Sequence, residues 1–325
     1  MNWSRKRSQT QLKMNADTIA RWLKLRGYRV LQTESSYWYS AGFGFLQAFP
    51  SHWQIQPSHK EISELIHHHR STGLRYTAPE NSNDGSLSYH IICADSDYNL
   101  SDLTRNARCH VKRGFEIATY GPVGFLELAN EGWIARYETL RRQRRVGVET
   151  NKWWRNLCES AIGLQGFEAW GARIGTRLVA SIISVRCDDC CLFLYQQSTD
   201  HALKLRINHA LTYSYTKDVL RERSSWINYG HHSLDAPMSV DEYKLRMGFR
   251  IKPVRQRVFF HPLIRSFISP KSYTLIDGIS SIANRSSLSK FSGLCRLYLN
   301  GTVHGTMQSI PELMLQHPNA IIRSM

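Results

Sequence analysis

"FEAWGARIGTRLVASIISVRCDDCCLFLYQQ", residues 167–197, consists of three runs rich in β-branched and aromatic residues. Gly175 separates the first run from the second, and Asp188 with Asp189 separates the second from the third. Short breaks at glycine and aspartate have the composition of hairpin turns. We therefore expect three antiparallel strands that form a meander.

The chain after this meander continues with alternating elements. An apolar stripe that includes Ile207 and Leu211 predicts one long helix over residues 202–223. Strands are expected at SWINYG (225–230) and at RQRVFF (255–260), because both runs are rich in aromatic or β-branched residues. A mostly helical, basic tail follows the second of these strands.

A short helix is expected between those two strands, within MSVDEYKLRMG (238–248). Ser239 and Glu242 have the Ser-x-x-Glu spacing of a capping box at a helix start. Gly248 stands where a helix would end in the left-handed conformation. Lys244 then lies in the last turn of this helix.

The first half of the chain also reads as mixed strands and helices. YRVLQTESSYWYSAGFGFLQAF (28–49) predicts short paired strands, and residues 58–70 place three apolar side chains on one face of a helix. Gly114 is expected to end a basic helix that begins near residue 100. Two further helices are expected between 124 and 165, separated by Gly147.

The composition points to a basic protein with an anionic partner. The 325 residues include 42 Lys and Arg against 26 Asp and Glu, a formal net charge of +16, which favours a phosphate-rich or otherwise anionic partner without identifying it. The length suits two domains, and no apolar window approaches the roughly 18 residues of a membrane span. The basic start contains no apolar secretory segment, which leaves a solvated amphipathic start or a transit peptide. We expect a cytoplasmic protein.

Seven cysteines, an odd number, do not suggest a disulfide framework. Cys187, Cys190 and Cys191 cluster in VRCDDCCLF, and the gap of two residues after Cys187 is typical of a zinc half-site. No second Cys or His pair follows at finger-like spacing. A hairpin turn at Asp188 and Asp189 explains the same spacing, so we favour the turn and expect no metal site.

The order of elements resembles a known family. Strand, strand, strand, helix, strand, short helix ending in Gly-Phe and strand, from about 166 to 261, is similar to the core of the GNAT acyltransferases. A closer resemblance is to the FemABX-like branch, the peptidoglycan bridge aminoacyltransferase-like proteins, in which two such folds are joined. YKLRMG at 243–248 looks like the branch's Phe/Tyr-Lys-x-x-Phe/Met-Gly element, and DLTRNARCHVKRGFEI at 102–117 is similar to its basic junction helix.

This resemblance implies both a fold and an activity. The fold class would be α/β (α+β), with two GNAT-like mixed-sheet subdomains, flanking helices and a helical tail, divided as 1–120, 121–261 and 262–325. The activity would be N-acyl transfer from an activated donor, acyl-CoA or aminoacyl-tRNA, to a small-molecule or cell-wall-precursor amine. The donor would act as a co-substrate, with no tightly bound cofactor.

Two departures from the GNAT pattern concern the donor. CoA-dependent members carry a glycine-rich loop at the start of the long helix, where bare backbone N–H groups bind pyrophosphate. The corresponding STDHALKLRINHAL (198–211) contains no glycine, which argues against a CoA site of the usual type. Those members also often have a tyrosine where this chain has Lys244.

The catalytic candidates are Lys244, His231 and Asp235. The resemblance implies that Lys244 holds a phosphate or stabilises an oxyanion, although an exposed lysine at a helix end remains the alternative. His231 and Asp235 follow the strand at 225–230, where they could act as a base or hold the amine. Asp235 could instead cap a turn before Pro237. The substrate-binding candidates are Arg105, Arg108, Arg141, Arg145, Tyr195, Gln197 and Tyr229.

A second function class is compatible with the same sequence. A basic nucleic-acid-binding protein could keep an acyltransferase-like scaffold without turnover, because a fold does not dictate a function. The missing glycine loop would suit such a protein equally well. An assay for transfer to amines distinguishes the two.

Overall fold

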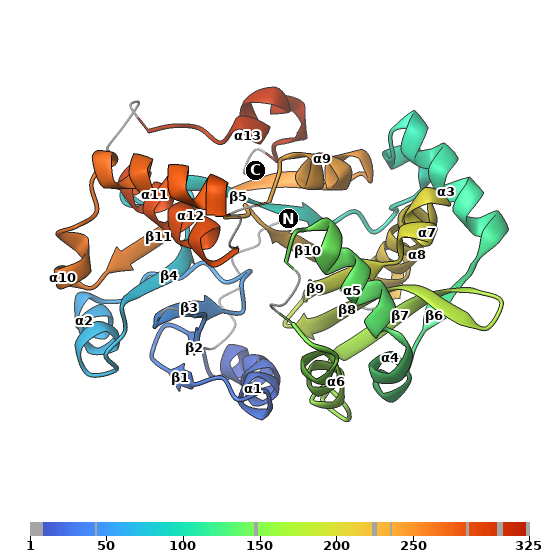
Figure 1. The fold of residues 1–325 in the computed structure, drawn as a ribbon, viewed down its shortest axis with the longest axis horizontal. Coiled ribbons are helices and arrows are strands. Elements are labelled where there is room, and N and C mark those ends of the chain that lie inside the picture. Colours follow the sequence, from blue (N-terminus) through green and yellow to red (C-terminus); the bar gives the residue numbers. More distant parts are fainter. Residues whose placement is uncertain are drawn as a thin grey trace.

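The computed structural model describes residues 9–322 apart from 43, 146–148, 223–225, 235, 284–285 and 304–307. Its centre is one mixed sheet of 11 strands (Figure 1). In sheet order the strands are β1 (Val30–Gln32), β2 (Tyr37–Ser40), β3 (Phe45–Phe49), β4 (Gly73–Ala78), β11 (Arg250–Phe260), β5 (Ser86–Cys93), β10 (Trp226–His231), β9 (Cys190–Ser198), β8 (Arg177–Cys187), β7 (Phe167–Ile174) and β6 (Thr119–Pro122).

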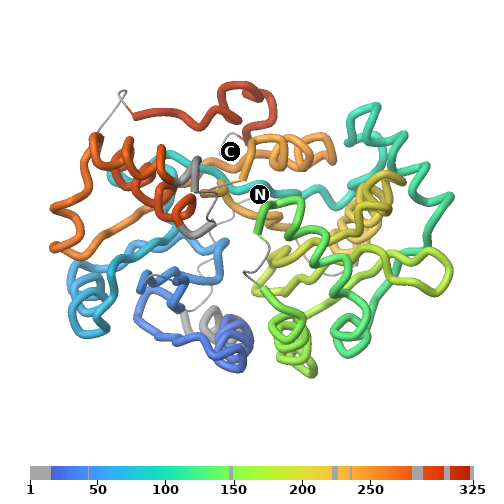
Figure 2. Tube along the Cα trace, viewed as in Figure 1, coloured from blue at the N-terminus to red at the C-terminus, as the bar shows by residue number. Residues whose placement is uncertain are grey.

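Strands from the two ends of the chain alternate in the middle of this sheet. β11 pairs antiparallel with β4 on one side and with β5 on the other, and β5 pairs antiparallel with β10. In Figure 2 the orange C-terminal strand accordingly lies among the blue and cyan N-terminal strands. The sheet is therefore continuous across both halves, while the boundaries at 120 and 261 stay predictions.

The meander predicted from residues 167–197 is confirmed. β7 pairs antiparallel with β8, and β8 pairs antiparallel with β9. The second turn places Cys187 directly opposite Cys190, with Asp188 in the left-handed region at φ +58°. Aspartate tolerates this conformation better than most residues, which explains the hairpin at this position.

The prediction of one continuous helix over 202–223 is wrong. Two helices are present, α7 (Asp200–Lys204) and α8 (Ile207–Glu222). Arg206 between them has φ +65°, which a continuous right-handed helix does not contain. The expected apolar stripe is real, since Ile207 and Leu211 are fully buried, but the break falls at a residue outside it.

The prediction that Gly114 ends a helix is also wrong. α3 (Arg105–Ile117) continues through this residue. A Cβ atom at position 114 would lie only 2.6 Å from the Cβ of Ala210 in α8, so the glycine allows the two helices to pack closely. Its role is tertiary contact and not helix termination.

Three helices occupy the segment in which two were expected: α4 (Phe125–Glu131), α5 (Trp133–Arg142) and α6 (Asn151–Glu159). The first predicted helix is divided at Gly132, where a Cβ would come within 2.8 Å of Leu128 and Trp154. The expected separation at Gly147 lies outside the described residues.

The short helix α9 (Ser239–Arg246) is confirmed, but its capping box is not. Met238 occupies the N-cap position with helical angles of φ −56° and ψ −31°, so Ser239 is already inside the helix. Gly248 has φ +86°, as expected of a left-handed residue just after a helix. The chain then turns directly into β11.

The N-terminal helices are α1 (Gln9–Leu25) and α2 (His59–His67). α2 buries Ile62, Leu65 and Ile66 against the N-terminal strands, as their spacing predicted. α1 lies beside α6 (Figure 1), where the Trp22 indole N–H donates to the Leu157 carbonyl at 3.2 Å. The first helix thus packs against the second half of the chain.

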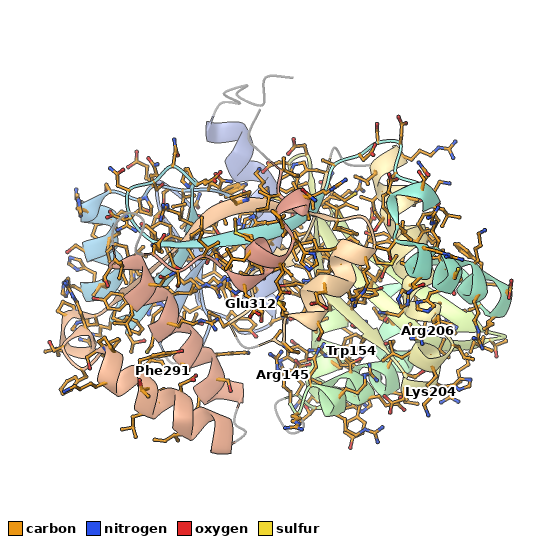
Figure 3. All side chains as sticks on the ribbon, turned by 90° about the horizontal axis from the view of Figure 1, so that it is seen from above. Arg145, Trp154, Lys204, Arg206, Phe291 and Glu312 are labelled. Atoms are coloured by element: carbon orange, nitrogen blue, oxygen red, sulfur yellow. The ribbon has the colours of Figure 1, made fainter. Side chains whose placement is uncertain are left out.

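The tail is helical, as expected, with α10 (Pro262–Arg265), α11 (Pro270–Ala283), α12 (Ser286–Gly301) and α13 (Glu312–Gln316). Leu294 and Leu297 of α12 share a core cluster with Phe260 of β11 and Phe45 of β3, so this helix covers the N-terminal half of the sheet. Seen from above, Phe291 of α12 lies at the opposite side of the molecule from Arg206 (Figure 3). Among the described helices, none has the length and apolar character that crossing a membrane requires.

Candidate active site

Lys244 lies in the last turn of α9, where its residue surface is only 9% exposed. The alternative interpretation of a solvent-exposed lysine at a helix end therefore does not hold. Its ammonium Nζ lies 2.7 Å from Oδ1 of Asp241, one turn earlier in the same helix. A charged group at this depth requires such a partner, because an unpaired buried charge is strongly unfavourable.

Asp241 connects Lys244 to the sheet below it. Its other oxygen, Oδ2, accepts a hydrogen bond of 2.8 Å from the hydroxyl of Tyr89 in β5. The Tyr89 ring stacks on the imidazole of His232 at a centroid distance of 4.7 Å. Burial and the Asp241 carboxylate raise the pKa of Tyr89, so its hydroxyl remains a hydrogen-bond donor. The carboxylate is therefore held by two donors, one charged and one neutral.

The end of β10 is shaped to receive the ammonium. Gly230 has φ +132°, a conformation that favours glycine, and a Cβ at this position would lie 3.6 Å from Lys244 Nζ. The ring of Tyr229 lies under the same ammonium, with its centroid 5.2 Å from Nζ. This distance suits a cation–π interaction.

The two strands beside Lys244 diverge. β9 and β10 pair in parallel only over Cys190–Leu192 and Trp226–Asn228, although β9 continues to Ser198. Polar side chains occupy the space beyond the last pair: Tyr229 donates to Gln196 Oε1, and Gln196 Nε2 donates to Asn208 and Thr212, each at 2.8 Å. The space between the two strands is thus spanned by this hydrogen-bonded network and by aromatic packing, since the Tyr229 ring lies 4.7 Å from that of Phe193 in β9 and 5.0 Å from that of Phe249.

His231 lies at the end of β10, close enough to Lys244 to be affected by its charge. Burial, together with Arg75, His90 and Lys244, lowers the pKa of His231 well below its ordinary value. The imidazole is therefore neutral at pH 7, which makes it a weak base but a competent hydrogen-bond partner. A cavity of about 10 Å³, enough for one water molecule, borders its side chain together with Thr77 and Gln256.

Asp235 lies outside the described residues, so its proposed role stays a prediction.

Gln197 and Tyr195 point away from the Lys244 side of β9. Gln197 donates its side-chain amide to Ser181 in β8, and Tyr195 packs against Trp153 of α6. Gln196, which alternation places on the opposite face, is the residue that reaches Tyr229.

The four arginine candidates occupy two helix ends. Arg105 and Arg108 lie in the first turn of α3, whose preceding residue Thr104 donates its backbone N–H to the Arg246 carbonyl of α9 at 3.0 Å. Arg141 is in the last turn of α5, and Arg145 follows that helix. Their roles in binding substrate stay predictions.

The start of α7, where a CoA-binding loop would be expected, carries carboxylates. The backbone N–H of Asp200 donates to Glu138, and the Asp200 carboxylate accepts hydrogen bonds from Arg141 and Arg142. The bonds from Arg142 and Arg141 lower the pKa of Asp200 and keep it ionised. A cavity of about 420 Å³ lies here and is lined by Glu138, Ile174, Arg177, Val179, Thr199, Asp200 and His201. Two carboxylates and two arginines thus meet at the start of this helix.

Cys158 is a core residue and not a candidate nucleophile. It is fully buried in α6, and burial raises the pKa of its thiol to about 12. A thiol with this pKa is not ionised at pH 7, so it is a poor nucleophile. The side chains gathered around Lys244 therefore remain the main candidates for chemistry.

Asp241 and Tyr89 are the residues of this site that the sequence did not single out. One of them had a signal: Asp241 precedes Lys244 by three residues, a spacing that places two side chains on the same face of a helix. Tyr89 is 152 residues from its partner Asp241, so local spacing could not connect them.

Comparison with known proteins identifies the fold. No model of a protein family matches the sequence, and no protein of curated function matches it either. Among solved structures, FemX is similar over 75% of this chain and 94% of its own, with a TM-score of 0.52 and 8% identity. The C-terminal DUF2156 domain of a putative lysylphosphatidylglycerol synthetase from Agrobacterium fabrum is similar over 84% and 96%, with a TM-score of 0.52 and 10% identity.

The structure of a conserved protein of unknown function from Bacteroides thetaiotaomicron is also similar, over 78% of this chain and 92% of its own, with a TM-score of 0.52 and 11% identity. The chain therefore has a fold similar to that of FemX, as the order of its elements implied. Identities of this size establish the fold alone.

Proposed function

We propose that the protein is an N-acyltransferase, which transfers an acyl or aminoacyl group from an activated donor to an amine. The observation that carries this proposal is the placement of Lys244: a buried ammonium, held by Asp241, at the point where β9 and β10 diverge. A fixed positive charge in a partly desolvated site stabilises developing negative charge far better than one in water.

The chemistry follows from this placement. The neutral amine attacks the carbonyl carbon of the donor, a C–N bond forms, and the carbonyl oxygen becomes an oxyanion. Lys244 Nζ donates to that oxyanion while Asp241 and the Tyr229 ring keep the ammonium in place. The bond to the leaving oxygen or sulfur then breaks, and the proton lost by the amine neutralises the leaving group. No covalent enzyme intermediate is required, because the donor is already activated.

The carboxylates at the start of α7 bear on the donor. Where a CoA-dependent enzyme of this fold would present bare backbone N–H groups, the Asp200 N–H is already bonded to Glu138, and Arg141 and Arg142 are already paired with the Asp200 carboxylate. This favours a donor that is bound by other surfaces. An aminoacyl-tRNA is such a donor, and the net charge of +16 suits its phosphates.

The test is a transfer assay with both donor classes. Wild-type protein is incubated separately with a labelled aminoacyl-tRNA mixture and with labelled acetyl-CoA, each with a panel of amines that includes peptidoglycan precursors and amino sugars. Label should move to an amine from at least one donor, and the aminoacyl-tRNA is the donor we expect. Lys24→Ala is the control for substitutions of Lys244, because Lys24 is an exposed lysine that also lies in the last turn of a helix.

The alternative of a nucleic-acid-binding protein predicts a different result. It requires RNA binding that weakens steeply as salt rises, with no transfer from either donor. That outcome would overturn the proposal of an N-acyltransferase. Transfer from a donor combined with binding of uncharged tRNA would instead support the enzyme and identify its donor class.

A further inference from the structure

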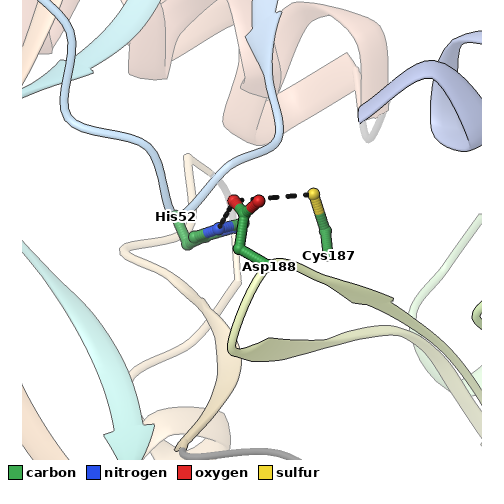
Figure 4. A group of neighbouring side chains, drawn as sticks. All are labelled: His52, Cys187 and Asp188. Atoms are coloured by element: carbon green, nitrogen blue, oxygen red, sulfur yellow. Dashed lines mark hydrogen bonds and ion pairs between the residues drawn. The ribbon is translucent and has the colours of Figure 1, made fainter. Parts of the chain in front are cut away.

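Three side chains able to bind a metal meet at the turn between β8 and β9 (Figure 4). Cys187 ends β8, Asp188 begins the turn, and His52 reaches them from the segment after β3. Their candidate ligand atoms all lie within 4.8 Å of one another. All three are withdrawn from solvent: the side chains of His52 and Asp188 are 5% and 6% exposed, and Cys187 is 1% exposed.

The distances between these atoms resemble those around a small tetrahedral ion. His52 Nε2 lies 3.4 Å from Asp188 Oδ2, and Cys187 Sγ lies 3.9 Å from the same oxygen. Zinc bonds of about 2.0–2.1 Å to nitrogen or oxygen and about 2.3 Å to sulfur place neighbouring ligands about 3.3–3.6 Å apart in a tetrahedron. The His52–Asp188 distance already falls in this range, whereas the sulfur would have to move closer to both other ligands, which now lie within 4.8 Å of it; the fourth position would be left to water.

We propose that His52, Cys187 and Asp188 bind a zinc ion. Zn²⁺ accepts this combination of imidazole, thiolate and carboxylate. On binding, Cys187 releases its thiol proton, and the two negative ligands then balance the two positive charges of the ion. The buried site becomes neutral overall, which avoids the cost of an uncompensated charge.

Neighbouring residues support such a site. Trp53 donates its indole N–H to Asp188 Oδ2 at 2.8 Å, which fixes the carboxylate in the way that outer hydrogen bonds orient metal ligands. Trp226 donates to Asp189 Oδ1 at 3.2 Å and holds the other turn residue. Cys190 lies directly opposite Cys187 in the hairpin register and brings a second thiol to the same end of the hairpin.

The consequence would be a cross-link between distant parts of the chain. His52 and Asp188 are 136 residues apart, one after an N-terminal strand and the other in the meander. An ion bound by both would stabilise the folded state, because the unfolded chain does not hold these ligands together. Its three ligands are not among the residues around Lys244, and the proposal does not depend on the proposed transfer activity.

The experiment measures metal directly on the full-length protein after removal of any affinity tag. Zinc content is determined on protein from zinc-supplemented medium, and the metal-free protein is then titrated with Co²⁺. Cobalt bound by a thiolate gives visible ligand-field bands and a near-ultraviolet charge-transfer band. The variants are Cys187→Ser and His52→Gln, and the exposed cysteine variant Cys109→Ser is the matched control. Circular dichroism confirms that each variant is folded.

We expect one zinc per chain, a cobalt spectrum with the thiolate band, and a lower melting temperature after chelation. Cys187→Ser should remove the thiolate band, His52→Gln should weaken zinc binding at least tenfold, and Cys109→Ser should change neither. His52→Gln keeps a polar side chain, so it remains informative if Cys187→Ser does not fold. Absence of stoichiometric metal, or binding that is the same in His52→Gln as in wild type, would overturn the proposal.

Discussion

The ammonium of Lys244 and the carboxylate of Asp241 form an ion pair of 2.7 Å, with side chains that are 11% and 8% exposed. The two residues are three apart in α9, and the Tyr89 hydroxyl from β5 donates to the second carboxylate oxygen. The pair therefore fixes the ammonium in position and joins α9 to the sheet. Substitutions of these two residues can therefore test their contribution to stability separately from their contribution to transfer activity.

The first prediction concerns stability. Lys244→Met or Asp241→Asn alone should lower the free energy of unfolding by about 3–5 kcal/mol, because each leaves a buried charge without its partner. The double variant should lose at least 1 kcal/mol less than the sum of the two single losses, as expected for coupled residues. Urea denaturation of all four proteins measures this coupling. Strictly additive losses would mean that the two charges do not stabilise each other.

The second prediction concerns the ring beneath the ammonium. Tyr229→Phe keeps the ring and removes the hydrogen bond to Gln196, whereas Tyr229→Leu removes both. If the ring positions Lys244, the leucine variant should lower kcat by up to about thirtyfold, since a cation–π interaction is worth about 0.5–2 kcal/mol. The phenylalanine variant should stay within about threefold of wild type. Equal losses in both variants would assign the effect to the hydroxyl instead.

The third prediction concerns acid. Burial, with Lys252, His52 and Arg75 nearby, lowers the pKa of His90 to about 3, and burial with Arg296 lowers that of His232 to about 4. The unfolded chain takes up these protons near pH 6.5 and the folded chain does not, so stability is complete above pH 6.5 and falls from there toward pH 4.

Each such histidine adds about 1.4 kcal/mol per pH unit to the slope across this range. Urea denaturation at pH 7.5, 6.0 and 5.0 measures the slope. His90→Gln should reduce this slope by up to the contribution of one histidine, about 1.4 kcal/mol per pH unit. The substitution His68→Gln, at an exposed position, should leave the slope unchanged. An unaltered slope in His90→Gln would show that His90 is not kept neutral by the fold.

The fourth prediction compares two glycines inside helices. Gly114→Ala places a Cβ 2.6 Å from the Cβ of Ala210 and should cost about 1–3 kcal/mol, because α3 and α8 must separate. Gly278→Ala in α11 meets no atom within 4 Å and should stabilise by up to about 1 kcal/mol through helix propensity. Midpoints of urea denaturation should move in opposite directions. A stabilising Gly114→Ala would contradict the close packing of α3 on α8.

Much of the fold could be predicted because its signals are local. The meander follows from runs of β-formers and from turn residues that lie within 31 residues of sequence, at 167–197. The pairing of β11 with β4 and β5 has no such signal, since Val258 and its partner Arg75 are far apart in the sequence. Gly114 shows the same limit: its contact with Ala210 exists only once two helices pack.

The site was predictable only in part. Lys244 came from a short motif, and the structure adds what holds it: Asp241 from the same helix and Tyr89 from a distant strand. The carboxylates at the start of α7 were visible as residue types, but the approach of Glu138 to Asp200 depends on how α5 packs. His52 gave no signal at all, because its partners are 135 or more residues away.

The most direct test measures single-turnover transfer by the double variant Lys244→Met with Asp241→Asn, using the donor that the wild-type protein accepts. Removing both charges leaves no unpaired buried charge, so this variant should be folded, while its transfer rate should fall at least about a hundredfold, as for loss of a preorganised oxyanion donor. Lys24→Ala should transfer at the wild-type rate. A folded double variant that also transfers at the wild-type rate would contradict a role for Lys244 in the reaction.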